Sequence, residues 1–503
     1  GLNSVGVLSS GGLGRIMAHW ITTGLPDVDV TGFNVDRFRD WQLDADYRAA
    51  RTAEILGTVY AAHTPGKQLH TVRNQLLSPV HERLVAAGGY LRDVSGWESP
   101  DWYAGPGQTP AATPTWGRAD WFDTWEAEHR AIREGVGVMD MSFMAKFSVT
   151  SPGSGDAATA LNLLSVASID GRDAVGDGAA PAEQNQIVYT QWLNDDGRIE
   201  ADLTVTRLAA DRFLVVASDT AHGHTEALLR RLQTSPAITQ GEATTNGEAA
   251  LSYDVRDITA ELAQLNVQGP RSRELLARLT ETDLSNEAFG FRTAATVTLA
   301  GVELLLVRIT YLGELGYELY IPAAEAVTVW DALFAAGAEL GVRPVGLKAL
   351  SSLRMEKAYR DFGHDIDNTD CPLEAGLGFA VDWTKPDFVG REALAARKAA
   401  NAAAGGMNQR LVQVLLSDPE PLMYHAEPVY RDGEYVGYLR AASYGWTLGG
   451  AVGLAMVAAP EGTLVTPAWL NEGAWEVDVA GRRVPATVSL RPMYDPTNER
   501  IKG

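Results

Sequence analysis

The 503-residue chain is acidic, with a formal net charge of −22, and 46% of its residues are hydrophobic. This length supports several domains with substantial cores. The charge argues against nucleic acid as a partner, because a nucleic-acid-binding surface needs a basic footprint. No apolar run approaches the ~20 residues that span a bilayer, so we expect no membrane partner. The single cysteine, Cys371, excludes an intramolecular disulfide and suits a reducing, cytoplasmic location.

The first hundred residues combine a glycine cluster with helical patterns. Gly11, Gly12 and Gly14 precede an apolar run, so we predict a strand, a glycine turn and a helix there. Such a turn allows close backbone approach to a cofactor, and a helix N-terminus favours anions. The alternative is a tight turn before an ordinary helix, because short glycine clusters are weak motifs. Further helical patterns follow over 44–61 and 78–87.

The sequence contains no complete dinucleotide-binding fingerprint. That fingerprint needs a strand, G-x-G-x-x-G, a helix, and an acid about 20 residues further on. The nearest match, residues 153–158, lacks the third glycine, and we interpret it as a turn into a helix. The chain begins on Gly1 without a methionine. We therefore expect a fragment or the C-terminal part of a longer enzyme, which does not bind flavin tightly alone.

The middle of the chain is predicted to be a strand-rich α+β region that contains two unusual acids. An amphipathic helix is predicted over 121–134. The apolar run 302–309, a turn with two glycines, and the short strand 317–321 predict a β-hairpin. Glu318 lies in its second strand, where a buried carboxylate is costly unless a partner binds it. Asp202 stands at the head of another β-rich run, and the two acids indicate a pocket for a polar, planar ligand.

These stretches resemble the aminomethyltransferase of the glycine cleavage system. Residues 311–318, YLGELGYE, are similar to its Y-T-G-E-x-G-x-E hairpin, and residues 201–205, ADLTV, to its D-D-L-x-V strand. Three further segments follow in the family's order, namely 353–367, 372–378 and 387–392. Residues 1–21 resemble the end of the flavin-binding domain of dimethylglycine and sarcosine dehydrogenases and oxidases, and residues 96–103 resemble their G-W-E-x-P-x-W-F segment.

The resemblance implies a multidomain α+β fold of the aminomethyltransferase type. Its expected parts are a truncated remnant of an FAD-dependent oxidoreductase domain over 1–43, a connecting central domain over 44–110, a folate-binding domain over 115–395 and a C-terminal β-barrel over 407–503. In the remnant, the resemblance implies that Gly11, Gly12 and Gly14 belong to the flavin site.

The resemblance also implies a function. It is tetrahydrofolate-dependent one-carbon transfer, as the folate half of a flavoenzyme that oxidises N-methyl amines such as dimethylglycine or sarcosine. The product would be 5,10-methylenetetrahydrofolate. FAD is expected only in the full-length enzyme, with the upstream flavin domain as partner and the amine or its iminium as second substrate. The alternatives are a stand-alone aminomethyltransferase or demethylase, and a non-catalytic folate-binding module.

Two carboxylates are the leading candidates for the folate site. By resemblance, Asp202 is the catalytic acid that accepts the N10 hydrogen of tetrahydrofolate and stabilises the charge developing there. Its alternative is a strand-start residue that caps its own turn, and Glu200 beside it is expected on the surface. Glu318 is expected to bind two parallel N–H donors on the aminopyrimidine edge of the pterin. Its alternative is an exposed strand face.

Three further residues are candidates for contact with folate. Tyr189 and Tyr311 are at family positions whose rings or hydroxyls line the folate site, and their alternative is an ordinary aromatic core. Arg354 aligns with a family arginine near the ligand. Its alternative is an internal salt bridge to Glu356 or to an aspartate within 361–367.

No metal site is expected from the sequence. His222 and His224 lack further ligands at a useful spacing, so a surface loop is predicted there.

Overall fold

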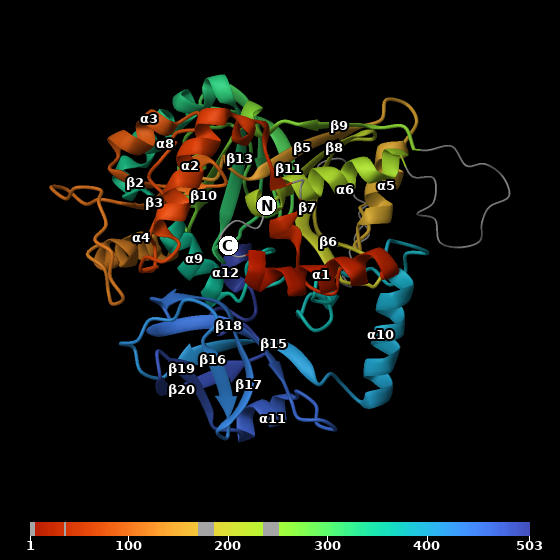
Figure 1. Ribbon diagram of the computed structural model, residues 1–503. Helices are drawn as coiled ribbons and strands as arrows, with labels where there is room; N and C mark the ends of the chain where they lie inside the picture. Colours follow the sequence, from red (N-terminus) through yellow and green to blue (C-terminus); the bar gives the residue numbers. More distant parts are fainter. Residues whose placement is uncertain (1–5, 35–36, 170–185, 235–250) are drawn as a thin grey trace.

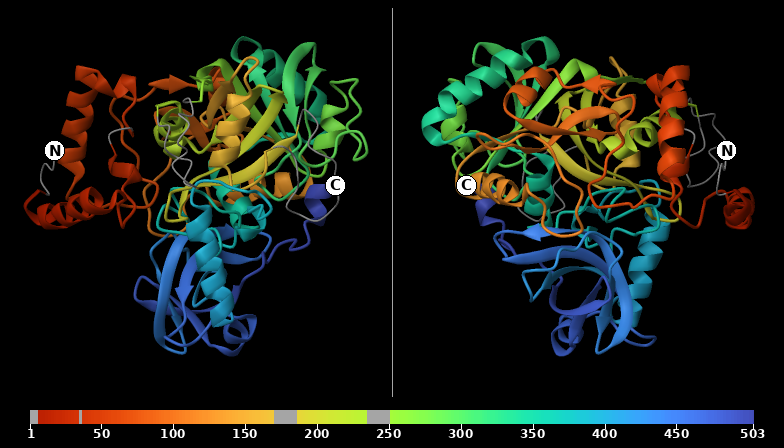
Figure 2. Two further views of the ribbon diagram at one scale, coloured as in Figure 1. Left: turned by 90° about the vertical axis from the view of Figure 1, so that its right-hand side faces the viewer. Right: turned by 60° about the vertical axis from the view of Figure 1, so that its left-hand side comes forward.

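The computed structural model describes residues 6–34, 37–169, 186–234 and 251–503 (Figure 1). Two large sheets lie next to each other, and a closed barrel lies below them in Figure 1. The N-terminal helices lie at one side of the molecule (Figure 2). Among the helices in these ranges, none is both long enough and apolar enough to cross a membrane.

The N-terminal part consists of two helices and a small sheet. Helix α1 spans Gly6–Thr23, and none of its 18 described residues is buried. Helix α2 spans Ala45–Thr58 and is capped by Asp44, which accepts a hydrogen bond from the backbone N–H of Tyr47. A three-stranded sheet in the order β1-β3-β2 follows. Its elements are β1 (Leu76–Leu77), α3 (His81–Ala86), β2 (Gly89–Val94) and β3 (Trp97–Tyr103).

The glycine cluster does not form the turn that the sequence predicted. Gly11, Gly12 and Gly14 lie inside α1, and a Cβ added to any of them would meet nothing within 4 Å. Backbone N–H groups in the middle of a helix already bond to the carbonyl four residues earlier. They are therefore not available to a phosphate, and the predicted turn into a helix is wrong for the described residues 6–23.

The first large sheet has five strands in the order β6-β7-β8-β5-β9. Its strands are β5 (Ala145–Thr150), β6 (Ile187–Leu193), β7 (Ile199–Ala209), β8 (Arg212–Ala217) and β9 (Asp254–Asp257), and its helices are α5 (Asp156–Leu164) and α6 (His222–Thr234). Leu203 and Val205 pack with Leu161 of α5 and Leu229 of α6. Because side chains alternate along a strand, Asp202 projects from the opposite face. Gly155 precedes α5 with φ +78°, which confirms the predicted turn into a helix.

The second large sheet has six strands in the order β11-β12-β13-β10-β4-β14. Its strands are β4 (Gly137–Asp140), β10 (Leu262–Gln268), β11 (Ala294–Leu299), β12 (Val302–Val307), β13 (Gly316–Pro322) and β14 (Arg343–Pro344), and its helices are α7 (Ser272–Leu276) and α8 (Ala326–Gly337). The antiparallel pairing of β12 with β13 confirms the predicted hairpin. Gly313 in its turn has φ +81°, a conformation that glycine adopts without strain.

The two sheets face each other with their helix-free sides. Leu265, Leu319 and Trp330 form the core between the second sheet and α8, so Glu318 projects from the other side of that sheet. A shared apolar cluster joins the helix-free sides of the two sheets, and its buried members are Ile187, Leu214, Val216, Ile258, Ala294, Val307 and Tyr320. The faces that carry Asp202 and Glu318 therefore border the same region between the sheets.

The C-terminal part is a barrel, as the sequence predicted. Its six strands close in the order β15-β18-β17-β16-β19-β20. The strands are β15 (Gln409–Leu416), β16 (Pro428–Arg431), β17 (Glu434–Gly445), β18 (Gly450–Ala458), β19 (Trp475–Val479) and β20 (Arg482–Ser489), and the remaining helices are α10 (Arg391–Ala404), α11 (Pro467–Glu472) and α12 (Glu499–Lys502). Helix α10 runs beside the barrel and leads into β15 (Figure 1).

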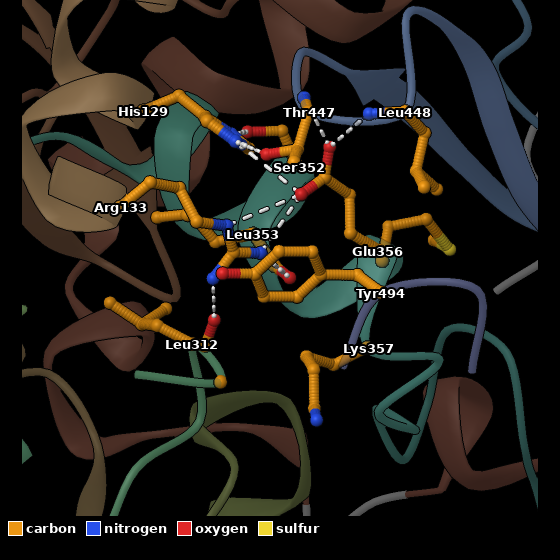
Figure 3. Close-up of polar contacts among 12 residues, drawn as sticks. His129, Arg133, Leu312, Ser352, Leu353, Glu356, Lys357, Thr447, Leu448 and Tyr494 are labelled. Atoms are coloured by element: carbon orange, nitrogen blue, oxygen red, sulfur yellow. Dashed lines mark hydrogen bonds and ion pairs between the residues drawn. The ribbon is translucent and has the colours of Figure 1, made fainter. Parts of the chain in front are cut away.

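A buried ionic network joins the barrel to two helices, α4 (Phe122–Glu134) and α9 (Leu347–Glu356) (Figure 3). Arg133 Nη2 on α4 donates to Glu356 Oε2 on α9 at 2.9 Å. Glu356 Oε1 accepts from the backbone N–H groups of Thr447 and Leu448, in the β17–β18 loop, at 2.7 and 3.2 Å. His129 Nε2 lies 3.4 Å from Glu356 Oε2, and burial lowers the pKa of this imidazole. Arg133 supplies the opposite charge to the carboxylate.

Candidate functional site

Asp202 lies on β7 directly opposite a buried amide. Its Cα partner in the antiparallel pairing is Gln191 of β6, and Gln191 Nε2 donates to Asp202 Oδ1 at 2.8 Å. Burial raises the pKa of Asp202 to about 7, against the opposing effect of hydrogen bonds from Gln191 and Tyr189. A carboxyl group with this pKa exchanges a proton near neutral pH, as a general base must.

Stacked aromatic rings flank this carboxylate. The half-buried ring of Tyr189 stacks on Phe379, with centroids 6.3 Å apart and planes inclined by 22°. Tyr311 stacks on Tyr359 at 6.0 Å, and its hydroxyl donates to the Arg360 carbonyl at 2.6 Å. Burial raises the pKa of both Tyr189 and Tyr311 well above the usual value, and the Asp202 charge adds to both shifts. The structure therefore brings three of the predicted site residues, Asp202, Tyr189 and Tyr311, into one neighbourhood.

Arg354 makes an internal ion pair, which the sequence analysis gave as the alternative to contact with folate. Its Nη1 donates to Asp365 Oδ1 and Oδ2 at 2.9 and 3.0 Å, and to the Tyr359 carbonyl at 3.1 Å. Only 5% of Arg354 is exposed. The pair fixes the segment after α9, which also carries Arg360 and Asp361. A direct contact of Arg354 with folate stays a prediction.

Glu318 lies on β13 within a row of buried polar side chains. Its carboxylate accepts from the Tyr320 hydroxyl at 2.6 Å and from Asn266 Nδ2 at 3.4 Å. Burial raises its pKa, and Tyr320, Asn266 and Lys146 act in the opposite direction. Gln264, Asn266 and Gln268 on β10 share one face and are all at least 97% buried. Glu318 is thus the partly exposed carboxylate of a polar strip, on a different sheet from Asp202.

An open, shallow cavity of about 560 Å³ lies next to the Tyr189–Phe379 stack. It is bordered by Phe379 and by the cationic side chains Lys398 and Arg410. Arg360 reaches the same region, because a Cβ on Gly376 of the cavity wall would lie 2.5 Å from its Nη2. In a chain of charge −22, this is a local basic site suited to carboxylates.

Two sequence predictions about residues around helix α6 are wrong. Glu200 is not on the surface: it is 9% exposed and lies 2.8 Å from His224 Nε2. Strand β7 has a bulge at Glu200, because Ala201 and Ile199 pair with the consecutive residues Trp192 and Leu193. The extra residue turns toward α6.

The second error concerns the two histidines, which lie in α6 and not in a surface loop. His222, Glu226 and Asp257 place ligand-type atoms within 4.8 Å of one another. Arg39 Nη2 lies 3.0 Å from Asp257 Oδ2 and 3.1 Å from His222 Nε2. The protein therefore supplies its own cation to this cluster.

Several residues of the neighbourhood were missed in the sequence. They are Gln191, Asn266, Arg360, Asp361 and Phe379. The alternating polar pattern Gln264, Asn266, Gln268 was a usable signal, since polar residues at every second position of a buried strand mark a polar face. The partners of Asp202 and Glu318 depend on strand register, which the sequence alone does not give.

Comparison with known proteins agrees with this architecture. Family models match in three consecutive parts: the FAD dependent oxidoreductase central domain over residues 23–78, the GCVT N-terminal domain over 80–385, and the glycine cleavage T-protein C-terminal barrel domain over 409–495. The chain belongs to the glycine cleavage T-protein family, in the branch that joins T-protein domains to an FAD-dependent oxidoreductase.

The relatives are longer than this chain. It is 40% identical over 504 residues to a 4-methylaminobutanoate oxidase (formaldehyde-forming) of Paenarthrobacter nicotinovorans, covering all of this chain and 56% of the relative. It is 31% identical over 529 residues to the mitochondrial sarcosine dehydrogenase of Homo sapiens, covering all of this chain and 55% of the relative. The chain thus spans about half the length of these relatives.

A solved structure shows the same fold. The glycine cleavage system aminomethyltransferase T from Bartonella henselae superposes with a TM-score of 0.64 at 22% identity, covering 84% of this chain and 99% of that protein. The expected aminomethyltransferase-like fold with its C-terminal barrel is therefore confirmed.

Proposed function

We propose that the chain binds tetrahydrofolate between its two large sheets and transfers a one-carbon unit to it. The observation that carries the proposal is the Asp202 carboxyl, whose pKa burial raises to about 7, held beside Gln191 and Tyr189. Glu318 on the facing sheet supplies the second carboxylate, for the aminopyrimidine edge of the pterin. Lys398 and Arg410 suit the carboxylates of the folate tail.

The proposed reaction consumes an iminium and forms 5,10-methylenetetrahydrofolate. The iminium carbon forms bonds to N5 and N10 of the folate, its bond to the amine nitrogen breaks, and the two displaced protons leave on the amine. Asp202 accepts the N10 proton and passes it on. The 4-methylaminobutanoate oxidase relative supports this chemistry, because the formaldehyde that it forms is at the oxidation level of the methylene group.

The iminium would come from an N-methyl amine oxidised by the flavin domain of the full-length enzyme. FAD would supply the oxidation there, whereas residues of this chain bind folate and manage its protons. Gly11, Gly12 and Gly14 form the middle of an exposed helix, and their place in a flavin site of the full-length enzyme stays a prediction. A sheltered path between the sites would protect the iminium from hydrolysis.

We expect the purified 503-residue chain to be colourless and to leave dimethylglycine and sarcosine unoxidised. The reason is that the glycine cluster lies in α1 and that no complete dinucleotide fingerprint occurs in the sequence. The measurement is an absorption spectrum with an amine oxidation assay. A stoichiometric flavin absorbance would contradict the prediction.

We expect Glu318→Gln to weaken the binding of tetrahydrofolate. The change turns one acceptor of the carboxylate into a donor that faces the pterin N–H groups. An unsatisfied buried donor costs roughly 1–3 kcal/mol, which corresponds to a loss of about 5- to 150-fold. Titration calorimetry on the chain measures it, with Glu303→Gln as control, because Glu303 is an exposed acid on the neighbouring strand β12. Unchanged affinity in Glu318→Gln removes Glu318 from the site.

A further inference from the structure

The two candidate carboxylates have the same surroundings, although they lie on different sheets. Each is the direct cross-strand partner of a buried amide: Gln191 pairs with Asp202, and Asn266 pairs with Glu318. In both pairs the amide nitrogen donates to the carboxylate. In both, a tyrosine acts on the same carboxylate: the Tyr320 hydroxyl donates to Glu318, and Tyr189 lowers the pKa of Asp202 against the effect of burial.

The first pair is the tighter one. Gln191 is fully buried, and its Nε2 lies 2.8 Å from Asp202 Oδ1. Its other amide atom, Oε1, is buried without a hydrogen-bond partner in the described part of the chain. An unpaired buried acceptor is costly. The hydrogen bond that Nε2 donates to Asp202 therefore has to offset the cost of burying Oε1.

The second pair follows the same pattern at a longer distance. Asn266 is 3% exposed, and its Nδ2 lies 3.4 Å from Glu318 Oε1. The Tyr320 hydroxyl donates to the other oxygen, Oε2, at 2.6 Å. Both oxygens of Glu318 therefore have a protein donor, and the carboxylate plane is fixed before any ligand arrives.

We propose that Gln191 and Asn266 are positioning residues, which hold Asp202 and Glu318 in the orientation and charge state that folate binding and proton transfer require. The proposal rests on the proposed function and adds two residues to it. Gln191 occupies Oδ1 of Asp202, which leaves Oδ2 to take up the proton. Asn266 keeps the Glu318 carboxylate in one plane, which favours two parallel N–H donors.

The charge of Asp202 depends on groups from several elements. Gln191 on β6 donates to it, and Tyr189 on the same strand favours its ionised form. After α9, Arg360 favours its ionised form and Asp361 opposes it. From the hairpin turn, Tyr311 interacts electrostatically with it. Of these, Gln191 is the fully buried neutral donor, so replacing it changes the carboxylate's environment without adding or removing a charge.

The test measures the protonation of Asp202 directly on the 503-residue chain without folate. Aspartate carboxyl carbons are labelled with ¹³C, the Asp202 signal is assigned by its loss in Asp202→Asn, and its titration is followed by NMR. We expect Gln191→Met to move the midpoint upward by about one pH unit, because a donor to the charged form is lost. Gln191→Glu should move it further, since two close carboxyls share one proton.

The matched control is Thr206→Val. Thr206 is polar and buried, and it lies on the same face of β7 as Asp202, four residues further along. This change should leave the titration midpoint of Asp202 unchanged. An unchanged midpoint in Gln191→Met overturns the role of Gln191, whether or not the chain transfers a one-carbon unit. A shift of the same size in Thr206→Val would also overturn it, because the effect would then be a general loosening of the sheet.

A second measurement addresses Asn266. Titration of tetrahydrofolate should show a loss of about 5- to 20-fold in affinity for Asn266→Leu, while the Asp202 midpoint stays at its parent value. Unchanged affinity overturns the role of Asn266. If the parent chain does not bind tetrahydrofolate at all, the proposed function fails. The NMR titration still decides the role of Gln191, because it is measured without folate.

Discussion

Asp202→Asn is expected to lower methylene transfer by about 10²-fold or more in the reconstituted full-length enzyme, the usual scale for one acid–base group. Asparagine keeps the size of the side chain and can still accept from Gln191, but it takes up no proton. Folate affinity should fall only modestly. Amine oxidation at the flavin should persist, with formaldehyde released in place of 5,10-methylenetetrahydrofolate. The measurement is the ratio of the two products per amine oxidised.

The pH dependence of methylene transfer provides a control for the Asp202→Asn result. Because burial raises the pKa of Asp202 to about 7, the ionised, basic form increases as the pH rises through neutrality. Transfer by the parent should therefore rise up to about pH 8 and level off, and Asp202→Asn should lack this rise. Asp196→Asn, an exposed acid in the turn of the same β6–β7 hairpin, should behave as the parent. If Asp202→Asn forms methylenetetrahydrofolate at the parent rate, Asp202 is only a structural partner of Gln191 on β6 and the mechanism is wrong.

Short sequence patterns correctly predicted elements that depend on neighbouring residues alone. The hairpin of β12 and β13 follows from two β-rich runs around a glycine turn, and both its strands and its turn are present. Helix α4 begins one residue after the predicted start, at Phe122. Both depend on periodicity and turn residues within a short window. The barrel, which is also present, was expected from the family resemblance.

The glycine cluster shows where local reasoning failed. Three glycines within four residues predicted a turn, yet α1 runs through all of them. A glycine inside a helix costs only about 1 kcal/mol relative to alanine, so apolar helix formers on both sides outweigh it. The propensity of a few residues does not determine the secondary structure when the residues on both sides favour a different one.

The errors within the site have a different origin. Glu200 was assigned to the surface because its partner, His224, lies 24 residues away on a helix whose position depends on the whole sheet. The bulge that turns Glu200 toward this helix is a property of two paired strands. Gln191 and Asn266 were missed for the same reason. A cross-strand partner is defined only when the register of both strands is known.

Arg354 and Glu356 illustrate the same limit at longer range. The sequence offered Glu356 and the nearby aspartates as partners for Arg354, and Asp365 is the one that binds it. Glu356 instead binds Arg133, which is 223 residues earlier, and two backbone N–H groups of the barrel. Ion pairs between distant helices follow from the packed fold, which spacing along the chain does not reveal.

We expect Glu356→Gln to destabilise the fold by about 3–5 kcal/mol, the usual cost of removing one partner from a buried ion pair. Glu356 is fully buried, and its two oxygens accept from Arg133, Thr447 and Leu448. Glutamine presents one acceptor and one donor where two acceptors are needed, and it leaves Arg133 with less negative charge. Urea unfolding at pH 7 measures the loss. The control is Glu126→Gln, which breaks the exposed Arg130–Glu126 pair on α4 and should cost at most about 1 kcal/mol.

The dependence of stability on acidic pH tests the same interaction in a second way. Burial would raise the pKa of Glu356, but His129 and Arg133 outweigh it and lower the pKa to about 2. A carboxyl whose folded pKa lies below its unfolded value, near 4.3, stabilises the fold fully above that value and loses this contribution as the pH falls toward 2. The parent should therefore lose stability between about pH 4.3 and 2, and Glu356→Gln should lose less over that range. If Glu356→Gln unfolds at the same urea concentration as Glu126→Gln, this carboxylate does not hold the barrel to helices α4 and α9.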